Sequence, residues 1–166
     1  PEAASSSGAG RGACPGAGSC QGLYTANTMA CCTEAMGMSL VGAGTALAAG
    51  GEKERIAYDS GIAACRLVAE DITARKIINR AAIRNAIRMD MALGGSTNSC
   101  LHLAAIAYEA GVDISLEVYD ELSQATPQIA HLRPAGEYMM EDFHWAGGIA
   151  GAFSMLADML EDNITV

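Results

Sequence analysis

Residues 74–98 read ARKIINRAAIRNAIRMDMALGGSTN and contain the clearest helical pattern of the sequence. Apolar residues recur there at helical spacing, which predicts one helix over residues 74–93 with an inward face formed by Ile78, Ala82 and Met89. Gly94–Gly95 follows directly, as is typical of a helix end. Ser96 or Thr97 can then cap a second helix. This stretch predicts a helix-rich fold.

The same signals, followed outward, predict further helices separated by glycine-rich or proline-containing breaks. We expect helices at 24–38, 53–70, 96–110, 116–124, 140–145 and 150–161, and a loop at 41–51. The helix at 53–70 is expected to turn Ile56, Ile62 and Leu67 inward. The best strand candidate is Gln128–Leu132.

Composition limits the class of protein. The 166 residues are 51% hydrophobic and 17% charged, which excludes a disordered chain. The length suits one domain or part of a larger one. No run of 18 uncharged apolar residues occurs, so a membrane-spanning helix is not expected.

The charge distribution argues against nucleic-acid binding. The formal net charge is −9, whereas such proteins carry a basic surface. Four basic residues nevertheless step by four along the helix predicted at 74–93, namely Lys76, Arg80, Arg84 and Arg88. A solvated or salt-bridged face is the favoured interpretation, and a groove for phosphate or RNA is the alternative.

Six cysteines are present, at positions 14, 20, 31, 32, 65 and 100. Their spacing does not match a structural zinc site. Cys31, Cys32, Cys65 and Cys100 fit small buried side chains in a reducing compartment. Cys20 differs, because it lies in a glycine-rich loop just before a predicted helix. A helix N-terminus favours thiolate, the usual ligand of iron–sulfur clusters.

The motifs around this cysteine resemble those of the dihydroxy-acid dehydratases, within the family that also includes sugar-acid and 6-phosphogluconate dehydratases. The most specific are SCQGLYTANTM at 19–29 and MALGGSTN at 91–98. Four blocks carry the resemblance in the family's order: Ala13–Leu40, Ile72–Asn98, Cys100–Ile114 and Pro127–Gly148. The resemblance implies a lead-in at 1–12 and, at 13–166, a partial N-terminal catalytic domain. The implied class is α/β: a helix-rich part of a three-layer domain with one to three short strands.

The resemblance also implies cofactors. Cys20 matches one of three cysteines that hold an iron–sulfur cluster, of the 2Fe-2S or 4Fe-4S type, whereas Cys14 matches a position without a ligand. The other two cysteines and the carboxylates and modified lysine that hold Mg²⁺ belong to motifs upstream of this segment. The serine base belongs to a C-terminal domain. No catalytic residue is therefore expected in this segment, which should be inactive alone.

The implied reaction is the dehydration of a 2,3-dihydroxy acid, such as 2,3-dihydroxy-isovalerate, to a 2-keto acid in branched-chain amino-acid biosynthesis. The implied protein is a homo-oligomer of the cytoplasm or an organelle matrix, with a small-molecule substrate and no nucleic-acid or membrane partner. A sugar-acid (aldonate) dehydratase and a non-catalytic helical remnant are the alternatives. Met139 departs from the histidine usual in the family at that position, and Gln21 and Ser99–Cys100 also depart from the usual residues.

Two motifs keep two interpretations each. Ser96–Thr97 can simply cap a helix, or the backbone N–H groups of that helix can face a cluster or substrate. Glu141–Asp142 fits helix-start electrostatics better than acid–base catalysis.

Overall fold

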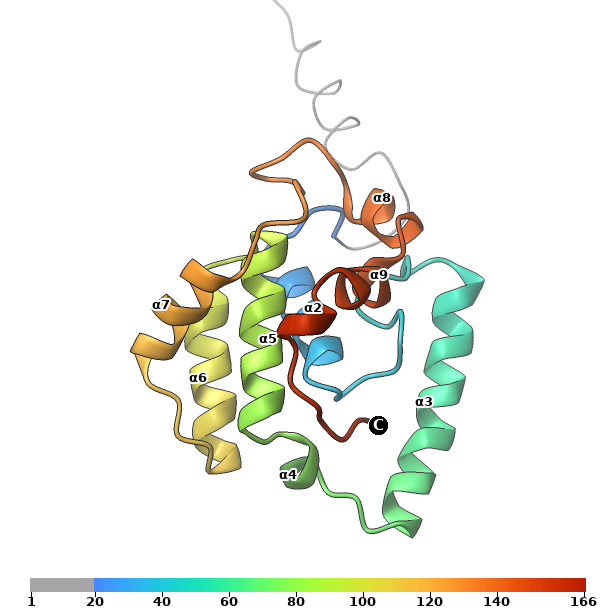
Figure 1. Ribbon diagram of the computed structural model, residues 1–166. Coiled ribbons are helices and arrows are strands. Elements are labelled where there is room, and N and C mark those ends of the chain that lie inside the picture. Colours follow the sequence, from blue (N-terminus) through green and yellow to red (C-terminus); the bar gives the residue numbers. More distant parts are fainter. Residues whose placement is uncertain (1–19) are drawn as a thin grey trace, which may run out of the picture.

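The computed structural model describes residues 20–166, and this part of the chain is a bundle of helices joined by irregular loops (Figure 1). The helices are α2 (Thr25–Ala35), α3 (Gly51–Ala69), α4 (Ala74–Ile77), α5 (Arg80–Leu93), α6 (Asn98–Ala110), α7 (Leu116–Ala125), α8 (Met140–Trp145), α9 (Gly148–Met155) and the 3-10 helix η1 (Ala157–Met159). The predicted helix-rich character is confirmed, and the predicted bounds 140–145 of α8 agree with the structure.

Helices α2 and α5 form the centre of the bundle and separate two buried cores. The first core lies toward α8 and α9 and includes Cys31, Met89, Leu93, Ile149 and Leu156. The second lies toward α6 and α7 and includes Cys32, Ile83, Ile87, Leu103 and Leu122. The adjacent residues Cys31 and Cys32 thus face opposite cores, and this arrangement fixes the orientation of α2 about its own axis.

The helix predicted at 74–93 is two helices in the structure. Asn79 leaves the helical conformation, and its side-chain oxygen accepts a hydrogen bond from the backbone N–H of Ala82 at 3.0 Å. Asparagine favours such caps because its side chain competes for backbone groups. Gly94 then ends α5 in a left-handed conformation (φ 69°), as its position in the sequence predicts.

The prediction of a strand at Gln128–Leu132 is wrong. The described residues contain no strand, and this segment forms only an isolated bridge between Leu132 and Tyr138. The backbone N–H of Ile129 donates instead to Ala92 O at the end of α5, at 2.8 Å. The α/β class therefore stays a prediction.

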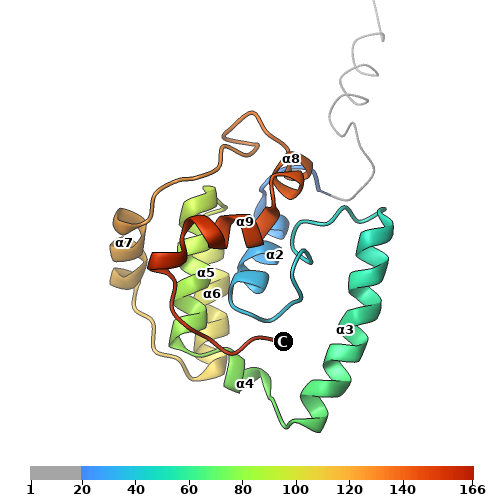
Figure 2. The same ribbon diagram turned by 45° about the vertical axis from the view of Figure 1, so that its right-hand side comes forward.

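Helix α3 stands apart from the other helices in both views (Figure 1, Figure 2). None of its residues is buried, and the side chain of Ile62, predicted to turn inward, is 57% exposed. The predicted inner face of this helix is thus only partly covered among residues 20–166, with Ile56 and Leu67 half-buried and Ile62 exposed. No helix of the described chain is long and apolar enough to cross a membrane.

Candidate functional site

Cys20 lies in the loop that leads into α2, and its side chain is partly buried. The thiol Sγ is 3.4 Å from the carbonyl oxygen of Gly22. Asn27, in the first turn of α2, donates from its side-chain nitrogen to the carbonyl oxygens of both Cys20 and Gly22, at 2.8 Å each. The helix that follows the thiol therefore also holds the loop that carries it.

The segment that leads into α8, together with the first residue of α8, also holds this loop. The backbone N–H of Leu23 donates to Arg133 O at 2.6 Å, and the N–H of Met140 donates to Gln21 O at 2.7 Å. Gly22 permits this approach, because a Cβ there would lie 2.9 Å from Arg133 O. The loop at 20–23 is thus fixed by the side chain of Asn27 and by backbone groups of Arg133 and Met140.

The two most specific sequence motifs meet beside this loop. The hydroxyl oxygens of Thr25 and Ser96 are 2.9 Å apart, and the side-chain amide of Asn98 donates to Thr25 Oγ1 at 2.9 Å. The backbone N–H of Ser96 donates to the buried hydroxyl of Thr28 at 3.0 Å. Contacts between these distant parts of the sequence thereby bring the starts of α2 and α6 together near Cys20.

Asp90 is a buried acid beneath this junction. Its carboxylate accepts a hydrogen bond from the hydroxyl of Ser99, while Oδ1 has no hydrogen-bond partner among the described residues. Burial raises the pKa of Asp90 to about 6, against the opposing effect of the Ser99 bond. A Cβ at Gly95 would overlap Asp90 Oδ1, so only glycine fits there.

Within residues 20–166, the other cysteines form no metal-binding group with Cys20. Cys31 and Cys32 are buried as predicted, and burial raises the pKa of the Cys31 thiol to about 12 and that of Cys32 well above its usual value. Both thiols therefore stay protonated. The expectation for Cys65 is wrong, because it lies on α3 and is exposed, and Cys100 is partly buried. Cys14 lies outside the described residues.

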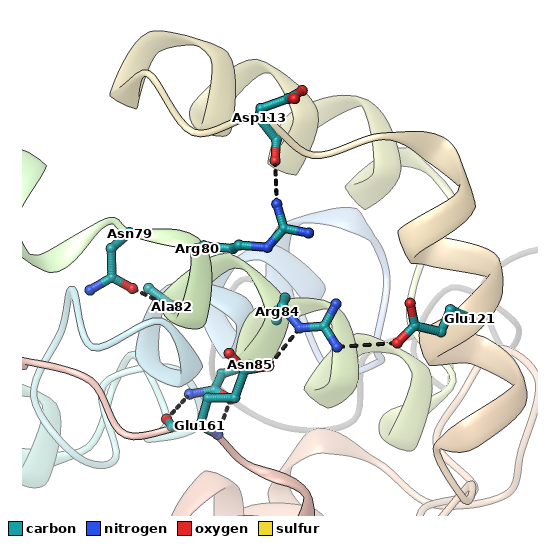
Figure 3. A network of polar contacts seen from close by, with 8 residues as sticks. All are labelled: Asn79, Arg80, Ala82, Arg84, Asn85, Asp113, Glu121 and Glu161. Carbon is teal, nitrogen blue, oxygen red and sulfur yellow. Dashed lines mark hydrogen bonds and ion pairs between the residues drawn. The ribbon is translucent and has the colours of Figure 1, made fainter.

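Arg80 and Arg84 of α5 form hydrogen bonds and ion pairs within the protein (Figure 3). Arg84 contacts Glu161 at 2.5 Å and Glu121 at 3.2 Å, and Arg80 donates to Asp113 O at 3.0 Å. Lys76, on the separate helix α4, pairs with Asp71 at 2.9 Å. The salt-bridged interpretation is confirmed for Lys76 and Arg84, which lie on two different helices. Arg80 bonds to a backbone carbonyl instead, and the buried Nε of Arg88 has no hydrogen-bond partner among the described residues.

A second polar network was not predicted from the sequence. His144 Nδ1 lies 3.0 Å from the hydroxyl of Thr45, and its Nε2 lies 3.1 Å from Glu52 at the start of α3. Buried Glu34 accepts hydrogen bonds from the N–H groups of Gly42 and Gly44 at 2.8 Å each. Burial raises the pKa of Glu34, with these bonds opposing the shift. These contacts hold the loop at 41–50 against α2.

The role of Asn27 was also not predicted, because the sequence presents this residue only as part of the YTANTM motif. The available signal was an asparagine in the first turn of a helix, where such side chains commonly bond to nearby backbone. Asp142 agrees with its predicted role, since its carboxylate accepts from the backbone N–H of Met139 at the start of α8, at 2.7 Å.

The described residues contain no group of three or more His, Cys, Asp or Glu side chains able to hold a metal ion. The cluster role expected for Cys20 therefore stays a prediction. The carbonyl of Cys20 is fixed by Asn27, and the start of α2 directly follows its loop.

Comparison with known proteins places these motifs in a family. The family model described as dihydroxy-acid/6-phosphogluconate dehydratase N-terminal matches residues 3–166. The dihydroxy-acid dehydratases of Geobacter sulfurreducens and Syntrophotalea carbinolica are 58% and 56% identical to this chain over 154 residues, or 93% of its length. That of Thermodesulfovibrio yellowstonii is 53% identical over the same share. The chain spans 28% of the length of each of these curated relatives. The chain belongs to the dihydroxy-acid/6-phosphogluconate dehydratase family and matches its N-terminal part.

Proposed function

We propose that this chain is part of the N-terminal catalytic domain of a hydro-lyase that converts 2,3-dihydroxy carboxylic acids to 2-keto acids. Identity of 58% to a dihydroxy-acid dehydratase over 93% of the chain is the observation that carries the proposal. Those relatives favour the dihydroxy-acid branch over a sugar-acid dehydratase. The role that follows is a step of branched-chain amino-acid biosynthesis.

In this proposal Cys20 is one thiolate ligand of an iron–sulfur cluster. The loop at 20–23 is held by the side chain of Asn27 and by backbone groups of Arg133 and Met140, which suits a ligand that must keep one orientation. Cys31 and Cys32 are poorly placed as partners, because their side chains are buried in the two apolar cores. The remaining ligands come from parts of the protein outside residues 20–166.

When bound, such a cluster together with Mg²⁺ supplies Lewis-acid polarisation of the substrate hydroxyl and carboxylate groups. The overall reaction removes the C2 proton and the C3 hydroxyl as water, and the remaining enol tautomerises to the 2-keto acid. This chain contributes the thiol of Cys20 and the polar surface formed by Thr25, Ser96 and Asn98. We assign no proton transfer to these residues.

The test is the Cys20→Ser variant in the complete polypeptide that carries this sequence, purified without oxygen. We expect loss of bound iron and acid-labile sulfide and loss of dehydration of 2,3-dihydroxy-isovalerate, because an alcohol does not replace a thiolate ligand. Cys65→Ser is the matched control, since Cys65 is exposed on α3. Near-normal iron content and turnover in Cys20→Ser would refute the assignment.

A further inference from the structure

We propose that Asn27 is a positioning residue for Cys20, and that its side-chain amide fixes the backbone of the thiol-bearing loop in the conformation that presents Cys20 to a cluster. The inference rests on the proposed function, since the cluster is part of that proposal. It adds a role for a residue that has no contact with the thiol sulfur among the hydrogen bonds of the described chain.

The geometry that carries this inference is a bridge from one side chain to two carbonyl groups. Asn27 is the third residue of α2, and side chains in a helix tilt toward its N-terminus. Its Nδ2 reaches back to Cys20 O and Gly22 O, at 2.8 Å each. Both N–H bonds of the amide are therefore used on carbonyls that flank Gln21, which restrains the backbone on both sides of this residue.

The chemistry of the bridge requires asparagine. A side-chain amide has two N–H donors, whereas an ionised carboxylate has none. Aspartate is nearly the same size as asparagine, so Asn27→Asp would direct a negative oxygen at two carbonyl oxygens and release the loop. Side chains that orient a metal ligand without touching the metal typically contribute roughly 10–100-fold to metal affinity.

The chain offers a matched control at the far end of α2. Asn163 Nδ2 also donates to two carbonyl oxygens, those of Met36 at 3.1 Å and Ile77 at 3.2 Å. Met36 follows the last residue of α2, whereas Cys20 precedes the first. Asn163→Asp therefore makes the same chemical change to the same kind of bridge, but away from Cys20.

The experiment compares the two variants with wild type in the complete polypeptide, purified without oxygen. Iron and acid-labile sulfide are measured per chain, and the decay of the cluster's visible absorption is followed after addition of an iron chelator. We expect the cluster of Asn27→Asp to decay at least about tenfold faster than that of wild type, in line with the effect of other ligand-orienting residues. Asn163→Asp should lose its cluster at the wild-type rate. Thermal unfolding of each iron-free protein reports whether the fold is retained.

Cluster loss at the wild-type rate in Asn27→Asp, or equally fast loss in both variants, would overturn the positioning role. If Asn27→Asp does not fold, Asn27→Ala replaces it, because alanine removes the bridge without adding charge. A second readout is the alkylation rate of Cys20 in iron-free protein, followed by peptide mass spectrometry. Faster alkylation of Cys20 in the Asn27 variant than in wild type supports the positioning role, and equal rates in the two proteins refute it.

A wild-type protein without iron would refute the proposed function. The alkylation rate would then still decide whether Asn27 fixes the loop at 20–22.

Discussion

At the scale of single residues, the contact between the motifs at 19–29 and 91–98 requires glycine at position 95. A Cβ at Gly95 would overlap Asp90 Oδ1 and would lie 2.7 Å from Thr28 Cγ2. Asp90 and Thr28 are both buried, and Thr28 also accepts the hydrogen bond that holds Ser96. Any side chain at position 95 must therefore displace the contacts that bring the starts of α2 and α6 together.

Gly95→Ala should therefore destabilise the protein by about 1–3 kcal/mol, the usual cost of overpacking a close-packed site. The measurement is the midpoint of urea unfolding. Gly61→Ala is the control, because Gly61 lies within α3 and nothing lies within 4 Å of the Cβ it would gain. That variant should not lose stability, since alanine favours a helix more than glycine does. Equal stability of Gly95→Ala and wild type would contradict the structure of the junction.

The sequence was informative about residues whose role lies in their own chemistry or local position. Cys20 is predictable as a candidate ligand because thiolates bind iron and a helix start follows, and Gly94 is predictable as a helix end. Asn27 and Asp90 are not predictable in this way, since their roles depend on which backbone or side chain faces them in the fold. A contact between distant positions, such as that of Thr25 with Ser96, has no signature in one sequence.

At the scale of elements, the C-terminal segment is held to α5 by reciprocal hydrogen bonds. Buried Asn85 donates to Glu161 O at 2.7 Å and accepts from the backbone N–H of Glu161 at 2.9 Å (Figure 3). The Glu161 side chain also contacts Arg84 at 2.5 Å. One turn of α5 therefore binds both the backbone and the carboxylate of the same residue.

Asn85→Ala should lower the free energy of unfolding by roughly 2 kcal/mol, because buried Asn85 satisfies two backbone groups that then lose their partner. Urea unfolding measures this loss. Asn98→Ala is the control, since Asn98 is exposed and its side chain donates to Thr25 at the protein surface. We expect a loss of about 0.5 kcal/mol or less there. A similar loss in both variants would show that the reciprocal bonds with Glu161 contribute little.

Several element boundaries agree with those predicted from the sequence, such as the ends of α5 and α6 at glycines, whereas others differ. The apolar spacing over 74–93 continues through Asn79, although the cap formed by this residue divides the segment into α4 and α5. Gln128–Leu132 has the apolar residues of a short strand but no neighbouring strand among the described residues. Local patterns therefore predicted the conformation available to a segment, whereas its tertiary neighbours decided the outcome.

At the scale of the whole molecule, α3 is attached mainly through its first turn. Glu52 contacts His144 at 3.1 Å, and the side-chain amine of Lys53 donates to Ala43 O. Beyond this turn the helix has no buried residue, and the side chains of Tyr58 and Val68 are 74% and 84% exposed. Among residues 20–166, this helix is therefore supported by its own backbone bonds and mainly by contacts near its first turn.

Amide hydrogen exchange of the chain should therefore show two levels of protection. Amides of α5, between both buried cores, should exchange only through the largest opening reactions, while those of α3 beyond residue 56 should exchange far faster through local opening. His144→Ala should speed exchange in the first turn of α3 without affecting α5, because it removes the contact with Glu52 and leaves both cores intact. Protection of α3 equal to that of α5 would mean that the helix is held by contacts other than those of its first turn.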